Sequence, residues 1–188
     1  LLAKGKKVRA VARGAEKLKA LEALGAEIFP ASLDDAALQK AFQGASAAFL
    51  MIPPHFTAPD VRAYQNKVGE NLAQAVQSAG VKYAVQLSSW GAHIGEKNGP
   101  IAGLYDNEQR LNRLEGLNVV HLRPAFFMEN HLMSVGTIKQ MGANGGPLKA
   151  DAPIPMIATR DIAAVAAELL SVRNFSGKTA RELLGPRD

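Results

Sequence analysis

The chain has 188 residues, 47% of them hydrophobic, which predicts one domain, residues 1–188, around a single well-buried core. It contains no cysteine, which excludes disulfide bonds and thiolate metal sites. Because it has no apolar run of about 18 residues and no secretory signal among its first residues, we expect a soluble, cytoplasmic protein without a membrane partner.

The formal net charge of +5 is concentrated at the start of the chain. Residues 1–19 hold seven basic side chains and one acidic side chain, so the rest of the chain sums to −1. Such a patch suits a small ligand that carries phosphate, whereas 6% aromatic residues offer little for stacking bases, and we expect no nucleic-acid partner. Ordinary surface lysines explain the patch equally well.

Short apolar runs alternate with amphipathic stretches in the first half of the chain. The first residues, up to Gly5, are typical of the last turn of a helix. Leucines at three-residue spacing predict a helix over 15–24, and Ser32 with Asp35 resembles the capping box of a second helix. Strands are predicted at residues 7–12, 27–31 and 47–52.

A strand that begins at Tyr83 and runs into the loop Ser88-Ser89-Trp90-Gly91 organises the second half of the chain. The apolar periodicity of residues 60–79 predicts a long helix before it. Residues 125–158 break the alternation and predict a small substrate-side lobe. The other predicted elements are a glycine-rich loop at 93–103, helices at 105–114 and 160–170, and strands at 118–122 and 179–184.

The alternation of strands and helices predicts an α/β fold with a doubly wound parallel sheet. The phosphate-binding loop G-x-G-x-x-G of such folds is missing from the chain. Gly177-Lys178-Thr179 resembles the end of a P-loop, but Val172 stands where that motif needs glycine, so we expect no triphosphate site. The histidines lack paired spacing, and we expect no metal.

Arg13 ends the first predicted strand, and Lys17 lies one turn into the helix that follows. A dinucleotide fold that selects NAD places an acidic residue near this strand end, to accept a hydrogen bond from the ribose 2′-hydroxyl. Cations there can bind a 2′-phosphate instead, which favours NADP over NAD. The alternative is that Arg13 is simply a polar strand end.

Five segments, in order, resemble the NmrA-like branch of the atypical short-chain dehydrogenase/reductase superfamily. They are VRAVARGAEKL, AAFLMIPP, VQLSSWGA, NEQRLNRLEGLNVVHLRPAFFMEN and IATRDIAAVAAELL. The resemblance implies a Rossmann-like sheet with NADP(H) across the carboxyl ends of its strands. It also implies that the chain begins after the first strand and glycine loop of the family, so we expect a fragment whose sheet is open in the middle.

The resemblance further implies roles for individual residues. Arg13 and Lys17 would hold the 2′-phosphate, and Ser88 and Ser89 would flank the nicotinamide. The other implied cofactor contacts are Ile52, Pro53 and Pro54 at the middle of the cofactor and Pro124, Ala125 and Phe126 at the nicotinamide.

Two positions depart from the pattern of the family. Where members often have Gly-Asp to contact adenine, this chain has Ala31-Ser32, so Ser32 is left as a helix cap and Leu33 as a backbone contact. Tyr105 matches the catalytic tyrosine, but Gln109 replaces the lysine that would lower the pKa of the phenol. We therefore consider Tyr105, Ser88 and Gln109 as candidate catalytic residues, with the alternative that Tyr105 is only a half-buried helix residue.

The leading functional hypothesis is an NADP(H)-dependent oxidoreductase that passes hydride to a small electron-poor acceptor such as a quinone. An alternative is a non-catalytic NADP(H)-sensing regulator that binds a protein partner, and a homodimer is also considered. A sugar-nucleotide epimerase or dehydratase is a further alternative, which Gln109 weakens because those reactions depend on the tyrosine.

Overall fold

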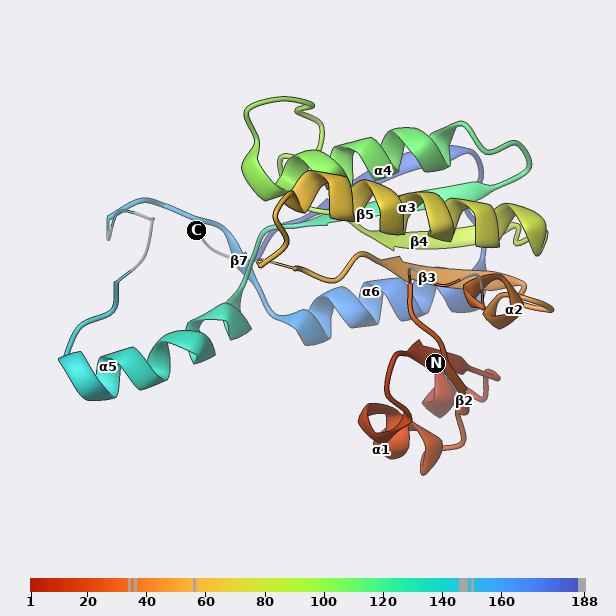
Figure 1. Cartoon of the computed structure of the whole chain (residues 1–188), viewed down its shortest axis with the longest axis horizontal. Coiled ribbons are helices and arrows are strands. Elements are labelled where there is room, and N and C mark those ends of the chain that lie inside the picture. The colour runs from red at the N-terminus through yellow and green to blue at the C-terminus, as the bar shows by residue number, and fades with distance from the viewer. Residues whose placement is uncertain (34, 36, 56, 146–148, 150, 186–188) are drawn as a thin grey trace.

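The computed structural model describes residues 1–185 except 34, 36, 56, 146–148 and 150. Its largest unit is a four-stranded parallel sheet in the order β3-β4-β5-β8. The strands are β3 (Ala47–Met51), β4 (Tyr83–Leu87), β5 (Asn118–Pro124) and β8 (Lys178–Leu183). Helices α3 (Val61–Ser78) and α4 (Ala102–Asn112) cover one face, and α6 (Thr159–Val172) covers the other (Figure 1). This arrangement confirms the predicted α/β fold.

A two-stranded parallel sheet stands apart from the main sheet. It pairs β1 (Arg9–Ala12) with β2 (Glu27–Pro30), which are joined by the 3-10 turn η2 (Ala15–Leu18) and the short helix α1 (Lys19–Glu22). Within the described residues, β1 pairs with β2 alone and β3 with β4 alone. The predicted opening in the sheet therefore lies between β1 and β3, and Figure 1 shows the separation.

Two apolar cores hold the main sheet. The first lies under α2 (Leu38–Ala41), α3 and α4 and contains Leu50, Val68 and Leu72. The second lies under α6 and contains Val85, Leu122 and Ile162. Helix α3 begins where expected, because the Asp60 carboxylate accepts a hydrogen bond from the backbone N–H of Ala63.

The helix predicted to start at Ser32 is shorter than expected. Its N-cap is Ala37, so the prediction that Ser32 caps it is wrong. The backbone turns at Ser32, whose carbonyl accepts from the N–H of Asp35. It turns again at Asp35, whose side chain accepts from the N–H of Ala37 and whose carbonyl accepts from the N–H of Leu38. This local turn displaces the helix start toward Leu38.

The remaining elements lie at the start of the chain, directly before α4 and in the small lobe. Leu2–Lys4 forms the 3-10 turn η1, which ends at Gly5 with a φ of 67°, as its sequence predicts. The others are η3 (Gly99–Ile101), β6 (Phe126–Phe127), η4 (Met128–Ser134), α5 (Val135–Met141) and β7 (Met156–Ile157), with β6 parallel to β7. In the part of the chain that the structure describes, no helix combines the length and apolarity needed to span a bilayer.

Candidate functional site

Strands β3, β4 and β5 end at one edge of the main sheet, because they are parallel and in register. Met51 lies opposite Leu87, and Leu87 opposite Leu122. The segments that follow the strands are the predicted cofactor contacts Ile52-Pro53-Pro54, Ser88-Ser89 and Ala125-Phe126. The topology thus brings these segments to a common edge, as expected for a ligand site in an open α/β sheet.

Backbone hydrogen bonds join two of these segments. The N–H of Ser88 donates to the carbonyl of Leu122 over 2.7 Å, and the N–H of Trp90 donates to that of Pro124 over 2.9 Å. Ala125 is buried, whereas Phe126 is half-buried. The loop after β4 and the end of β5 therefore form one continuous piece of the edge.

A buried carboxylate that the sequence reasoning missed lies beneath this edge. Glu108 on α4 is 1% exposed, and its Oε1 accepts a 2.5 Å hydrogen bond from the hydroxyl of Ser88. Arg123 on β5 binds both oxygens of Glu108, with distances of 3.0 and 2.6 Å from Nε and Nη2. The hydrogen bond to Glu108 is the main reason that the pKa of Arg123 is raised.

A sequence signal for Glu108 exists. It stands between Leu104 and Leu111, at spacings of four and three residues, and therefore on the apolar face of its helix. A carboxylate on such a face needs a buried partner. Arg123, in the mostly buried strand β5, is the basic residue that meets it.

Tyr105 and Gln109 lie one turn apart on α4, and both are half-buried. The loop before the helix lies against the tyrosine ring, since a Cβ atom at Gly95 would stand 3.0 Å from it. The side chain of Ser88 is directed to Glu108 rather than to these two residues. The structure places the three candidate catalytic residues on neighbouring elements but does not join them by a hydrogen bond within the described residues.

The ion pair between Arg62 and Asp106 braces α3 against α4 beside Tyr105. Arg62 donates to both oxygens of Asp106, over 2.7 and 2.8 Å, and its Nη2 lies 3.5 Å from the carbonyl oxygen of Gly95. The hydrogen bond from Arg62 is the largest reason that the pKa of Asp106 is lowered. The pair thus fixes the base of the loop over the tyrosine.

The predicted 2′-phosphate residues come directly after β1. Arg13 is exposed directly after β1, and Lys17 is exposed within η2. Arg9, which belongs to the same basic patch, is used differently: its Nη1 donates to the carbonyls of Ala41 and Gln43, each over 2.9 Å, and its Nε pairs with Glu27. The patch therefore contains one structural arginine and at least two cations available to a ligand.

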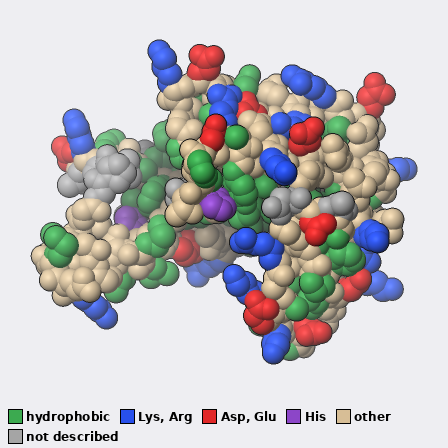
Figure 2. All heavy atoms as spheres, in the orientation of Figure 1, with side chains coloured by type: hydrophobic (Ala, Val, Ile, Leu, Met, Phe, Trp, Pro, Cys, Tyr) green, Lys and Arg blue, Asp and Glu red, His purple; other side chains and the backbone are tan. Residues whose placement is uncertain are grey.

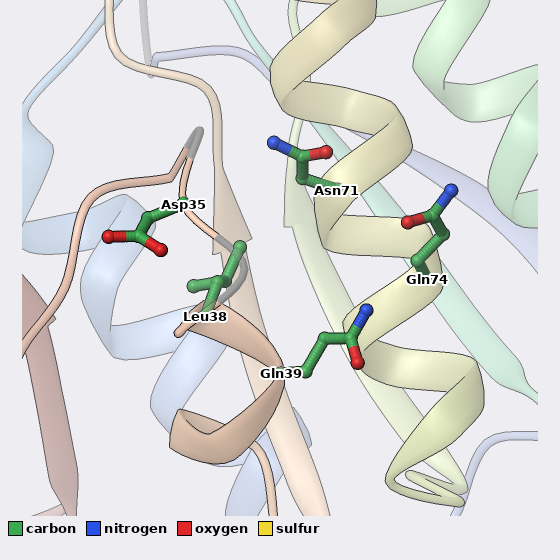
Figure 3. Close-up of a pocket in the computed structure, with 5 residues that line it drawn as sticks. All are labelled: Asp35, Leu38, Gln39, Asn71 and Gln74. Carbon is green, nitrogen blue, oxygen red and sulfur yellow. The ribbon is translucent and has the colours of Figure 1, made fainter.

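Leu33, predicted at the adenine end, lies beside α3. Its carbonyl accepts a 2.9 Å hydrogen bond from the side chain of Asn71, and Ser32 precedes it in the segment after β2. Asn71 also borders a hollow of about 160 Å³ between α2 and α3 (Figure 3). The lining residues are Asp35, Leu38, Gln39, Asn71 and Gln74.

The side chain of His121 is buried and contacts two amide side chains. It lies on β5, 2% exposed, with Nδ1 2.7 Å from Gln86 Oε1 and Nε2 2.9 Å from Asn112 Oδ1. Burial lowers its pKa to about 4. The imidazole is therefore neutral near pH 7, and with a single N–H it can donate to only one of these two amide side chains, one from β4 and one from α4.

Comparisons with known proteins agree with this architecture. Residues 1–182 match the NmrA-like family. The chain is 31% identical over 180 residues to a (4-alkanoyl-5-oxo-2,5-dihydrofuran-3-yl)methyl phosphate reductase of Streptomyces griseus, covering 95% of this chain and 60% of that protein. It is 30% identical over 164 residues to an NAD(P)H azoreductase of Xenophilus azovorans, covering 87% of this chain and 54% of that protein. It thus spans little more than half the length of these curated relatives.

Solved structures share the fold. An NADPH-dependent quinone oxidoreductase of Escherichia coli, complexed with NADPH, superposes with a TM-score of 0.80 at 26% identity, over 99% of this chain and 64% of that one. A triphenylmethane reductase of Citrobacter sp. gives a TM-score of 0.79 at 21% identity, over 98% of this chain and 63% of that one. The strand order, the shared carboxyl edge and these similarities lead to one conclusion: the chain belongs to the NmrA-like family and has a Rossmann-like fold.

Proposed function

We propose that this protein is an NADP(H)-dependent reductase that passes hydride to a small electron-poor acceptor such as a quinone. The observation that carries the proposal is the common carboxyl edge of β3, β4 and β5, with exposed cations after β1. The names of the relatives support it, since they include an NAD(P)H azoreductase and a quinone oxidoreductase bound to NADPH. The absence of cysteine suits a reducing compartment, so we assign the reaction to the cytoplasm.

The donor set fits a phosphorylated dinucleotide. Arg13 and Lys17 would hold the 2′-phosphate by charge-assisted hydrogen bonds, and Ser32 and Leu33 would lie at the adenine. The bound nicotinamide supplies the hydride. The residues assigned to the middle and the nicotinamide end of the cofactor are Ile52, Pro53, Pro54, Ser88, Ser89, Pro124, Ala125 and Phe126.

Positioning rather than acid catalysis would drive this transfer, because an electron-poor acceptor takes hydride with little help. Gln109 is neutral and cannot lower the pKa of Tyr105 by charge. We therefore assign Tyr105 and Gln109 to orienting the acceptor, at the end of α4 covered by the loop at Gly95.

The small lobe of residues 125–158 would contact the acceptor. β6 pairs with β7, and Glu129 accepts hydrogen bonds from the backbone N–H and the hydroxyl of Thr159, which ties the lobe to the start of α6. Apolar side chains lie on the surface of the arm formed by η4 and α5 (Figure 2). They are Met128, Leu132, Met133, Val135, Ile138 and Met141, and they suit a flat apolar acceptor.

A dinucleotide sensor that contacts a protein partner or a second copy is the second candidate, and Gln109 in place of a lysine favours it. Loss of NADPH absorbance in the presence of quinones and azo dyes separates the two functions. The reductase requires turnover with at least one acceptor. Tight NADPH binding without turnover on any acceptor would favour the sensor.

The cofactor assignment is tested by Arg13→Ala. Loss of a charge-assisted contact should weaken NADPH binding by about 10- to 100-fold and leave NADH binding nearly unchanged, as measured by fluorescence titration. Arg113→Ala is the matched control, because Arg113 is exposed at the far end of α4, toward the opposite edge of the sheet. Equal losses for NADPH and NADH would contradict the assignment.

A further inference from the structure

The hydrogen bond between Ser88 and Glu108 has a defined direction. Arg123 donates to both carboxylate oxygens of Glu108, in the two-point geometry that favours an ionised carboxylate. An ionised carboxylate has lone pairs and no proton to give. The proton in the 2.5 Å contact therefore belongs to the hydroxyl of Ser88, which is the donor.

This direction determines what Ser88 can offer to a ligand. A serine hydroxyl has one donor and two acceptor positions, and here the donor is used by Glu108. The backbone N–H of Ser88 is also used, since it donates to the carbonyl of Leu122. Both donors of Ser88 are therefore used, and its side chain has only oxygen lone pairs to offer, so it can accept a hydrogen bond from a ligand N–H but cannot donate one to a carbonyl.

The position of the hydroxyl is fixed from several sides. Ser88 is 4% exposed, and Glu108 is 1% exposed beneath it. Ser88 directly follows β4, Glu108 lies on α4 and Arg123 lies on β5, so three elements meet at this cluster. A rotation of the serine side chain would leave the buried carboxylate with one partner fewer, which is unfavourable.

We propose that Glu108, held by Arg123, is a positioning residue that fixes Ser88 as a hydrogen-bond acceptor for the carboxamide N–H of the nicotinamide. This inference rests on the proposed function, in which the nicotinamide lies at this edge. The carboxamide is the group of that ring that carries N–H donors, whereas the carbonyl of a hydride acceptor carries none. Ser88 thus recognises the cofactor, and the acceptor carbonyl is oriented by other residues.

The test compares NADP⁺ with its 3-acetylpyridine analogue, which lacks the carboxamide N–H. Isothermal titration should show that Ser88→Ala weakens NADP⁺ binding by about 10-fold and leaves binding of the analogue unchanged. A merely structural role of Ser88 would weaken both ligands alike. Ser78→Ala is the matched control, because the Ser78 hydroxyl donates to the carbonyl of Gln74 within α3, remote from the edge.

Variants of Glu108 test the positioning role. In Glu108→Gln the side-chain amide can donate a hydrogen bond to the Ser88 oxygen, so the serine hydroxyl is no longer held as a donor to residue 108. The preference for NADP⁺ over the analogue should then fall to near that of Ser88→Ala. Glu108→Asp keeps a carboxylate and should restore part of the preference. If either Ser88→Ala or Glu108→Gln retains the full preference, the inference is wrong while the proposed function stands. If the unmodified protein binds no NADP⁺, the proposed function fails and this inference fails with it.

Discussion

The four-stranded sheet and the two-stranded sheet of β1 and β2 are both parallel and built from short strands, but they are held in different ways. The four-stranded sheet lies between two apolar cores, and Leu50, Val85 and Leu122 in its strands are fully buried. Every residue of β1 and β2 is at least partly exposed, although Val11 and Phe29 pack against the first core. The comparison indicates that burial on both faces stabilises the centre of the large sheet, whereas the small sheet is held by partly buried apolar contacts and by polar contacts.

The largest expected effect concerns burial. Leu122→Ala should lower the free energy of unfolding by about 2–5 kcal/mol, because the Leu122 side chain is fully buried and its truncation leaves a cavity in the second core. Val11→Ala should cost less, about 1 kcal/mol, because that side chain keeps part of its contact with water. Urea denaturation measures both, with the exposed Leu24→Ala as control. Equal losses at Leu122 and Val11 would contradict the distinction between the sheets.

The second effect is a pH dependence of the large sheet. The pKa of His121 is about 4 in the folded protein, below its unfolded value of about 6.5, so the unfolded chain takes up the proton first. This contribution to stability is complete above pH 6.5 and is lost as the pH falls to about 4, a change of about 3 kcal/mol.

Urea denaturation from pH 7 to pH 4 measures the loss, with His121→Gln as the comparison that removes the imidazole. Its stability should depend less steeply on pH over this interval. Identical slopes for the two proteins would show that His121 is not the group responsible.

The smallest effect concerns the tether of the small sheet. Arg9→Met removes two hydrogen bonds to carbonyls near the end of α2 and the ion pair with Glu27, and should cost about 1–2 kcal/mol. Hydrogen exchange should show lower protection of the β1 and β2 amides and unchanged protection of β4. Lys7→Met is the control, since Lys7 is exposed just before the same strand. A uniform loss of protection in both sheets would mean that they unfold as one unit.

Features carried by local periodicity could be predicted from the sequence. The spacing of apolar residues predicts a helix over 60–79, and the structure has α3 at Val61–Ser78. The continuous apolar run 47–52 likewise becomes β3, an edge strand of the main sheet among the described residues. These elements can be predicted because the spacing of apolar residues within a helix or strand indicates which of its faces is buried.

Features that depend on pairs of distant side chains could not be predicted. Ser88 and Glu108 are 20 residues apart and Glu108 and Arg123 are 15 apart, and neither pair forms a motif. Composition alone placed Arg9 among the several basic residues that could bind a phosphate, whereas in the structure its side chain joins β1 to the end of α2. The sequence indicates which residue types are present, whereas the folded arrangement decides whether a charge faces a ligand or a carbonyl.

The free side of β3 has a consequence for the behaviour of the protein in solution. Within the described residues, β3 is hydrogen-bonded to a neighbour on one side alone, and Phe49 and Met51 on it are 44% and 47% exposed. A strand with open backbone groups and large apolar side chains is a template on which another extended chain can add. The open side of β3 therefore favours association with another extended chain wherever the strand is uncovered.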